Sequence, residues 1–441
     1  MSKFLTREEI ATAQLAQLRQ LLKKILPGNR FYQQKFSGIK TSLASLEDFS
    51  NRFPFTTKTE LVEDQLAHPL YGTNLTFPLK NYTRLHQTSG TTSAPLRWLD
   101  TPESWNWMCE SWQEIFRVAG VGAGDRIYFA FSFGPFIGFW LAFEAGQQLG
   151  CICIPGGGLS SESRLRAILE NAATVLCCTP TYAIRLAEVA ANEKINLNAA
   201  KIKTIIVAGE PGGSIPATRK RLEKLWPRAK IFDHHGMTET GPVTYECPVR
   251  PGVLHVIESA YFAEIIDANG KKVGSGETGE LVLTPLGRVG SPIFRYRTGD
   301  LVKPENIQHS TSNIQHSTSK PCLCGRHELA LEGGILGRTD DMVIVRGVNI
   351  YPSAVEEILR GFSEISEYQA QVDASQSLAE LKIQIEIKPD CADTAGLNQR
   401  VEQALQKAFS LRVPVLAVPA GTLPRFEMKA KRWVVTPRHQ A

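Results

Sequence analysis

The segment Thr88-Ser89-Gly90-Thr91-Thr92-Ser93-Ala94-Pro95 has the residue types needed to hold phosphate groups. Its consecutive small side chains contribute little to a hydrophobic core. Gly90 allows the backbone to come close to a ligand, and the hydroxyl and backbone N–H groups supply hydrogen-bond donors. A loop of this composition is also typical of an ordinary surface turn. Its meaning therefore depends on the polar segments that follow it.

A second group of residues has the chemistry of a metal site. Cys322 and Cys324 form a Cys-x-Cys pair, and Cys247 and His255 lie upstream. Three thiolates and one imidazole suit a tetrahedral zinc ion, so we expect one structural Zn²⁺ bound by these four residues. Buried free cysteines are also common packing residues, which is the alternative here. Packing is what we expect for the six other cysteines, Cys109, Cys151, Cys153, Cys177, Cys178 and Cys391.

Five further polar segments follow in order: Gly209–Gly212, His235–Glu239, Tyr296–Asp300, Gly337–Asp341 and Phe426–Ala430. Each one has an ordinary interpretation when it is taken alone. Asp300 follows a Thr-Gly turn, where aspartate is common. Glu239 suits a helix N-terminus, and Lys429 is one charge within a basic stretch, which is usually a solvated face. The order of the whole set carries more information than any single segment.

This ordered set resembles the adenylate-forming acyl-CoA synthetase superfamily over nearly the whole chain. The segments Thr179–Ala183 and Arg346–Pro352, the short N-terminal region and the C-terminal end are most similar to the phenylacetate–CoA ligase branch. Some members of that branch carry a zinc site. The resemblance implies that ATP and a carboxylic acid form an acyl-adenylate, with release of pyrophosphate. CoA then attacks the adenylate. In such reactions the protein mainly positions the reactants and neutralises charge.

The resemblance also implies roles for individual residues. Ser89, Gly90, Thr91 and Thr92 would hold the departing phosphates, Thr238 would contact the α-phosphate, and Glu239 would hold Mg²⁺, a hard cation that prefers oxygen ligands. Lys429 would be the catalytic lysine and Asp340 the hinge. The ribose and the base would be bound by Gly209, Glu210, Pro211, His235, Gly236, Met237, Asp300 and Arg338.

The chain departs from the family pattern at two places. Ser93 and Ala94 stand where the family loop usually has Gly-Lys, so a cation is missing there and Arg97 is a candidate substitute. His235 stands where an aromatic residue usually stacks on adenine. The acyl pocket is expected to be lined by Phe133, Phe136, Tyr182 and His234.

Composition excludes several classes of protein. The chain has 441 residues, of which 43% are hydrophobic and 21% charged, with a formal net charge of +5. These values are ordinary for a soluble globular protein and give no reason to expect a nucleic acid or a membrane as partner. Nine scattered cysteines do not form a disulfide framework, which predicts a reducing, cytoplasmic setting. The uncharged run 127–143 contains Gly134-Pro135, so we expect a buried strand over 126–131 and a helix from about Phe136 rather than a membrane span.

The hydrophobic pattern predicts an α/β fold. Leu15, Leu18, Leu22 and Ile25 have helical spacing. Apolar strands at 173–178, 202–208 and 230–232, with a helix opened by Ser214 between the last two, indicate a parallel sheet. Hairpin-like segments at 262–266 and 279–283 indicate a small β subdomain. The tandem heptapeptide 306–319 is expected to be a surface loop.

The last hundred or so residues predict a small, mobile α+β domain, with a strand at 381–387 and a helix containing Leu397, Val401, Leu405 and Phe409. We therefore expect a large N-terminal adenylation domain over 1–336 and a C-terminal lid domain over 337–441. The expected activity is that of an ATP-dependent carboxylate–CoA ligase for a small aromatic or arylacetic acid, and a homodimer is expected. The alternatives are transfer to a carrier-protein pantetheine or another acceptor, and a non-catalytic nucleotide-binding protein, which Glu239 and Lys429 disfavour.

Overall fold

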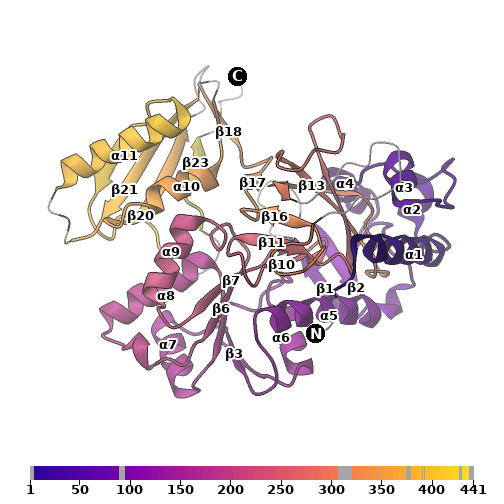
Figure 1. Cartoon of the computed structure of the whole chain (residues 1–441), viewed down its shortest axis with the longest axis horizontal. Coiled ribbons are helices and arrows are strands. Elements are labelled where there is room, and N and C mark those ends of the chain that lie inside the picture. Colours follow the sequence, from indigo (N-terminus) through magenta and orange to yellow (C-terminus); the bar gives the residue numbers. More distant parts are fainter. Residues whose placement is uncertain are drawn as a thin grey trace.

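The computed structural model describes residues 4–88, 95–305, 320–346, 348–373, 379–389, 391, 393–426 and 430–436. The predicted phosphate residues Ser89, Gly90, Thr91 and Thr92, the tandem heptapeptide and Lys429 lie outside these described residues. The chain folds into a large body and a smaller C-terminal body, which carries α10 and α11 (Figure 1).

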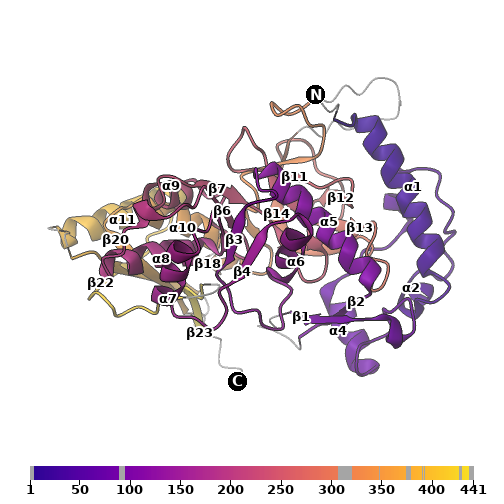
Figure 2. The same cartoon turned by 90° about the horizontal axis from the view of Figure 1, so that it is seen from below.

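The N-terminal helices form one end of the large body, opposite the C-terminal body (Figure 2). Helix α1 begins with a capping box formed by Thr6 and Glu9, and Leu18, Leu22 and Ile25 on its apolar stripe are buried. This confirms the predicted helix. The stripe packs against the β subdomain through Phe262 and other residues. The helices are α1 (Arg7–Ile25), α2 (Arg30–Lys35), α3 (Leu46–Arg52) and α4 (Lys58–Ala67), followed by the short 3₁₀ helix η1 (Leu79–Asn81).

The predicted parallel sheet is confirmed. Its strand order is β4-β3-β5-β6-β7, and all four neighbouring pairs are parallel. Its inner strands are apolar because helices cover both faces. The strands are β3 (Arg126–Phe129), β4 (Ile152–Pro155), β5 (Val175–Cys178), β6 (Thr204–Val207) and β7 (Lys230–Asp233). The helices of this region are α5 (Pro102–Val118), α6 (Trp140–Gln148), α7 (Ser161–Glu170), α8 (Pro180–Asn192) and α9 (Pro216–Leu225), with the 3₁₀ helix η2 (Leu197–Ala199).

Two local predictions were wrong. The N-cap of α9 is Ile215, whose side chain has no polar atom to cap a helix; Ser214 instead donates a hydrogen bond to Asp233 at 2.5 Å. Helix α6 begins at Trp140 rather than near Phe136. Phe133 and Gly138 have φ angles of 50° and 33°, which an α-helix cannot include, so the intervening segment is a loop.

The uncharged run 127–143 is thus divided between β3, this loop and α6. Within the described ranges, no helix combines the length and the apolar character needed to cross a membrane.

The β subdomain is built from two antiparallel sheets, which confirms the predicted hairpin of β12 with β13. One sheet contains β12 (Tyr261–Ile266), β13 (Gly279–Pro285), β14 (Tyr296–Val302) and β17 (Gly337–Arg338). The other contains β10 (Thr244–Glu246), β11 (Val253–Val256), β16 (Ala330–Glu332) and β15 (Pro304–Glu305). Two short hairpins complete the large body: β1 (Arg84–Gln87) with β2 (Arg97–Asp100), and β8 (Gly236–Met237) with β9 (Gly241–Pro242).

The C-terminal body has a hydrophobic core of its own, formed by residues between Val343 and Trp433. Its sheet order is β22-β21-β20-β23, and the predicted alternation holds because Leu381, Ile383 and Ile385 are buried. Leu397, Val401 and Leu405 of α11 pack on this core, as their spacing predicts. The elements are β18 (Val343–Val345), β19 (Val348–Ile350), α10 (Pro352–Arg360), β20 (Ile365–Asp373), β21 (Glu380–Ile387), α11 (Thr394–Phe409), β22 (Val415–Val418) and β23 (Trp433–Thr436).

Candidate active site

The site lies where β7 ends and the His234–Glu239 segment begins, at the carboxyl edge of the parallel sheet. Ligand sites of open α/β sheets are usually found at such an edge. His234 is buried against Trp112, with ring centroids 4.4 Å apart, and its Nδ1 lies 2.7 Å from the carbonyl oxygen of Thr244. Burial lowers the pKa of His234 to about 3, so its ring is neutral at physiological pH. The backbone N–H of His235 donates to the Thr244 hydroxyl, which fixes the start of the segment.

Asp300, His235 and Arg338 converge although they come from three separate segments. Strand β17 pairs with β14 so that Arg338 lies opposite Asp300, and Arg338 Nη1 donates to Asp300 Oδ1 at 3.0 Å. His235 Nε2 lies 3.1 Å from Asp300 Oδ2. Burial by itself raises the pKa of the Asp300 carboxyl, but His235 and Arg338 together outweigh it and lower that pKa. The buried carboxylate is therefore ionised and suited to accept hydrogen bonds from hydroxyl groups.

Arg338 also connects this site to the predicted hinge. Its Nε and Nη2 atoms donate to the two carboxylate oxygens of Asp340 at 2.8 and 2.9 Å. The Asp340 side chain is otherwise exposed. The segment that leads into the C-terminal body is thus held by the same guanidinium that contacts Asp300.

Glu239 lies nearby, and only 6% of its surface is exposed. The Tyr296 hydroxyl donates to Glu239 Oε1 at 3.4 Å, and Lys58 Nζ of α4 lies 3.8 Å from the same oxygen. A carboxylate in these surroundings has the hard oxygen chemistry that Mg²⁺ prefers. Gly236 and Met237 form β8, and Met237 packs against the small core around Tyr296.

Arg288 lies outside all of the sequence motifs described above, yet it contacts the site. It is completely buried, and its Nε and Nη2 atoms donate to Asp100 at 2.8 and 2.6 Å. Its Nη1 donates to the carbonyl oxygens of Thr238 and Glu239 at 2.7 and 2.9 Å. The ion pair therefore ties the Glu239 segment to β2, the strand that follows the predicted phosphate loop.

The sequence held a signal for this residue. Arg288 is the single charge between Glu280 and Arg295, in an apolar stretch, and a charge in such a place is usually buried with a partner. Arg97, the candidate substitute for the missing lysine, is exposed and donates from Nη1 to the Leu70 carbonyl oxygen at 3.0 Å.

The loop after β6 contains the predicted adenine wall. Gly209 and Pro211 are exposed, whereas the Glu210 side chain is half-buried. The two Glu210 carboxylate oxygens accept hydrogen bonds from the backbone N–H groups of Thr181 and Ala430. Glu210 therefore contacts both bodies of the protein.

The four predicted pocket residues do not all lie together. Phe133 and Phe136 share the loop between β3 and α6, where the Phe133 ring packs against Phe131 and Trp140, with centroids 4.3 and 4.9 Å away. The aromatic cluster continues to Trp112, the ring partner of His234. Tyr182 lies apart, fully buried in the core around α8, with its hydroxyl 3.0 Å from that of Ser161.

The four predicted metal ligands converge. One ligand atom from each of Cys247, His255, Cys322 and Cys324 lies within 4.8 Å of all the others. The Cys247 and Cys322 sulfurs are 3.8 Å apart, and Cys324 Sγ lies 3.5 Å from His255 Nε2. His255 Nδ1 lies 3.3 Å from the Glu328 carbonyl oxygen, which leaves Nε2 as the ligating atom. Three sulfurs and one nitrogen in this arrangement fit a tetrahedral metal centre.

Comparison with known proteins places the chain in a family. The AMP-binding enzyme family model matches residues 83–285, and the model of the AMP-binding enzyme C-terminal domain matches residues 347–436. The phenylacetate-coenzyme A ligase of Pseudomonas putida is 29% identical, and the alignment covers 95% of this chain and 92% of that protein. The phenylacetate-coenzyme A ligase of Escherichia coli K12 is 27% identical, with 96% and 94% covered.

Solved structures of a 2-hydroxyisobutyryl-CoA ligase show the same fold. Its postadenylation state with 2-HIB-AMP matches with a TM-score of 0.90 at 27% identity, covering 98% of this chain and 91% of that one. Its thioesterification state with 2-HIB-AMP and CoA matches with a TM-score of 0.71 at 28% identity, covering 99% and 91%. This chain therefore superposes better on the postadenylation state of that ligase than on its thioesterification state. The chain carries both domains of the AMP-binding enzyme family and belongs to this adenylate-forming family, and its curated relatives over nearly the whole chain are phenylacetate-coenzyme A ligases.

Proposed function

We propose that this protein activates a small aromatic or arylacetic acid with ATP and transfers the acyl group to CoA. The observation that carries the proposal is the convergence of His235, Asp300 and Arg338 beside the buried Glu239. These residues come from three motifs of the superfamily, and together they offer a carboxylate for ribose hydroxyls next to oxygen ligands for a cation.

In the first step a carboxylate oxygen of the acid attacks the α-phosphorus of ATP. The bond from that phosphorus to the oxygen shared with the β-phosphate breaks, and pyrophosphate leaves. Asp300 holds the ribose, Arg338 and Thr238 face the phosphate, and Lys429 stabilises the negative charge that gathers on it. Mg²⁺, when bound at Glu239, supplies further charge neutralisation. In the second step the CoA sulfur attacks the acyl carbon, AMP leaves, and the thiol proton passes to solvent.

Aromatic residues near His234 support an aromatic or arylacetic substrate. Phe133 packs on Phe131, and a continuous series of ring contacts runs from there through Phe139 and Trp112 to His234. Because the pKa of His234 is lowered to about 3, its neutral ring places no cation in this apolar region. The substrate carboxylate would then be oriented by groups near the α-phosphate rather than by His234.

Pyrophosphate release across a panel of acids, measured with and without CoA, tests this function. Phenylacetate and benzoate derivatives are expected to give pyrophosphate and, with CoA, a thioester. If pyrophosphate is released but a thioester forms only on a carrier-protein pantetheine, the acceptor is that pantetheine rather than CoA. ATP binding without pyrophosphate release for any acid would indicate a non-catalytic nucleotide-binding protein. A cytoplasmic location and a homodimer also stay predictions.

We further propose that Cys247, His255, Cys322 and Cys324 bind one structural Zn²⁺. The site has four protein ligands and no open position, so the metal would stabilise the β subdomain rather than take part in the reaction. It would tie Cys322, which follows the tandem heptapeptide, to β10 and β11.

Protein purified without added metal is expected to contain about one equivalent of zinc. Cys324→Ser should lose that zinc and unfold at a lower temperature, because the metal binds the folded state. Cys391→Ser, a change at a cysteine far from the cluster in sequence, should keep the zinc and serves as the matched control. Elemental analysis and thermal unfolding measure both effects. Less than about a tenth of an equivalent of zinc in the unaltered protein would contradict the site.

The division into domains at residues 336 and 337, with a hinge at Asp340, is part of the same proposal. The separate hydrophobic core that begins at Val343 supports it. Hinge residues absorb the backbone changes of domain rotation. The Arg338–Asp340 contact would then have to break when the C-terminal body rotates for the thioester step.

A further inference from the structure

The Glu210 carboxylate bridges the two bodies of the protein. Its Oε1 accepts a hydrogen bond from the Thr181 backbone N–H at 2.8 Å, and its Oε2 accepts one from the Ala430 backbone N–H at 2.9 Å. Thr181 is the second residue of α8, so its N–H group has no acceptor within the helix. The partial positive charge of a helix N-terminus also favours a carboxylate at this position.

The loop that carries Glu210 is held against α8 by a close backbone approach. Gly212 has a φ of 154°, and a Cβ atom at this position would lie 2.6 Å from the Pro180 Cβ. A side chain at position 212 is therefore excluded, and the Gly212 backbone packs directly against Pro180 in the first turn of α8. This contact places the Glu210 side chain within hydrogen-bond distance of the Thr181 N–H group.

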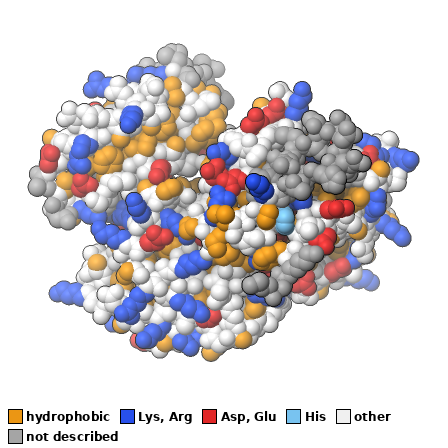
Figure 3. Space-filling model, viewed as in Figure 1, with side chains coloured by type: hydrophobic (Ala, Val, Ile, Leu, Met, Phe, Trp, Pro, Cys, Tyr) orange, Lys and Arg blue, Asp and Glu red, His pale blue; other side chains and the backbone are white. Residues whose placement is uncertain are grey.

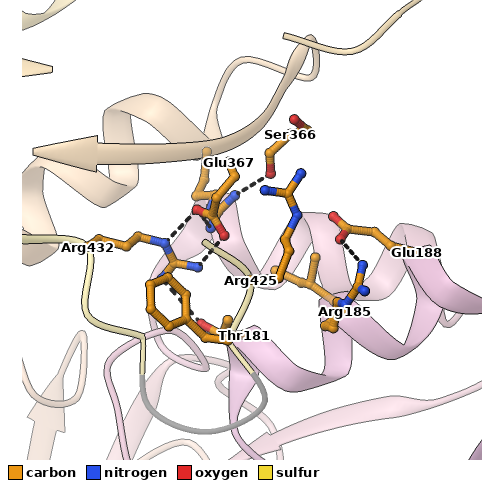
Figure 4. A pocket seen from close by; sticks show the side chains of 10 residues that line it. Thr181, Arg185, Glu188, Ser366, Glu367, Arg425 and Arg432 are labelled. Carbon is orange, nitrogen blue, oxygen red and sulfur yellow. Dashed lines mark hydrogen bonds and ion pairs between the residues drawn. The ribbon is translucent and has the colours of Figure 1, made fainter. Parts of the chain in front are cut away.

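Other polar contacts cross the boundary beside Glu210. Arg432 is 5% exposed; its Nε donates to Glu367 at 2.7 Å within its own body, and its Nη1 donates to the Thr181 hydroxyl at 3.3 Å (Figure 4). Arg221 of α9 donates to the Ser366 carbonyl oxygen at 3.4 Å. Charged side chains of both signs lie along this boundary (Figure 3). Glu210 thus belongs to a polar interface. Its partner from the C-terminal body is the backbone N–H of Ala430, the residue that follows Lys429.

We infer that Glu210 is a positioning residue for adenylation, which fixes Ala430 against α8 while the acyl-adenylate forms. The inference rests on the proposed function. A carboxylate that accepts two N–H groups makes charge-assisted hydrogen bonds, which are stronger than neutral ones. Because Ala430 leaves Glu210 if the C-terminal body rotates, this stabilisation applies to the first half-reaction and not to the second. The role differs from that of an adenine-slot residue, which would affect ATP binding.

Glu210→Gln tests the inference because glutamine has nearly the same shape but one acceptor oxygen in place of two. Glu210→Ala removes both acceptors. Glu193→Gln, at the other end of α8, makes the same chemical change on an exposed side chain and is the matched control. The rate constant and the KM for ATP come from acid-dependent pyrophosphate exchange. Thioester formation is measured separately from preformed acyl-adenylate and CoA. Hydrogen exchange of the 430–436 backbone reports the contact itself.

For Glu210→Gln we expect the adenylation rate constant to fall about tenfold, on the scale of one lost hydrogen bond to a charged group. The KM for ATP should change by less than about twofold. Thioester formation from preformed adenylate should equal that of the unaltered protein, and exchange at 430–436 should be faster. Glu193→Gln should match the unaltered protein in every assay.

Two kinetic outcomes would overturn the inference. A raised KM for ATP with an unchanged rate constant would assign Glu210 to the adenine slot. An equal loss in both half-reactions would assign it a merely structural role. If the unaltered protein catalyses neither half-reaction, the proposed function fails on its own. Hydrogen exchange does not depend on catalysis and tests the contact in that case as well. Unchanged exchange at 430–436 in Glu210→Ala would refute the Glu210–Ala430 contact.

Discussion

Lys429→Ala is expected to lower the rate of acyl-adenylate formation about a hundredfold or more, on the scale of losing one charge-stabilising group. As the substrate carboxylate attacks, negative charge gathers on the α-phosphate oxygens, and a positioned ammonium group stabilises the transition state more than the ground state. Lysine suits this role because it is a compact point charge on a flexible stem. Acid-dependent pyrophosphate exchange measures the effect.

The same variant, supplied with preformed acyl-adenylate and CoA, should form thioester at a rate comparable with that of the unaltered protein. Lys431→Ala is the matched control, since it removes the same charge two residues further on. A larger adenylation defect in Lys431→Ala would reassign the catalytic lysine. An equal loss of both half-reactions in Lys429→Ala would show that the residue does not act on adenylation alone.

Arg288→Met is expected to lower the free energy of unfolding by about 3–5 kcal/mol, because it leaves the Asp100 carboxylate buried without its partner. The change also removes the donors to the Thr238 and Glu239 carbonyl oxygens, so we expect adenylation to fall as well. Denaturant unfolding and pyrophosphate exchange measure the two effects. Arg166→Met breaks an exposed ion pair with Glu162 and should cost about 1 kcal/mol or less.

A double variant separates stability from positioning. Asp100→Leu combined with Arg288→Met removes both charges, and replacing a whole buried ion pair by apolar groups is often neutral for stability. The double variant should therefore recover most of the lost stability while adenylation stays low. If adenylation recovers together with stability, Arg288 supports the fold and does not position the Glu239 segment.

The sequence by itself determined the parts of this protein that depend on local pattern. Fully apolar runs such as 175–178 can be buried on both faces only in a covered parallel sheet, and the alternation in 381–387 gives a strand with one buried face. The ordered motifs identified the superfamily because the reaction requires those residue types. The residue types of the candidate metal cluster, three cysteines and one histidine, were likewise predictable from the sequence.

Only the tertiary structure decided which of these residues meet. The register of β14 with β17 places Arg338 opposite Asp300, and neither segment contains that information alone. Likewise, α6 begins at Trp140 because of the positive φ angles in the preceding loop, and Tyr182 enters the core because of the face of α8 on which it lies. Arg288 and Glu210 act through distant backbone groups. Such contacts depend on strand register and loop approach, which arise from packing of the whole chain, whereas periodicity and motif composition are local.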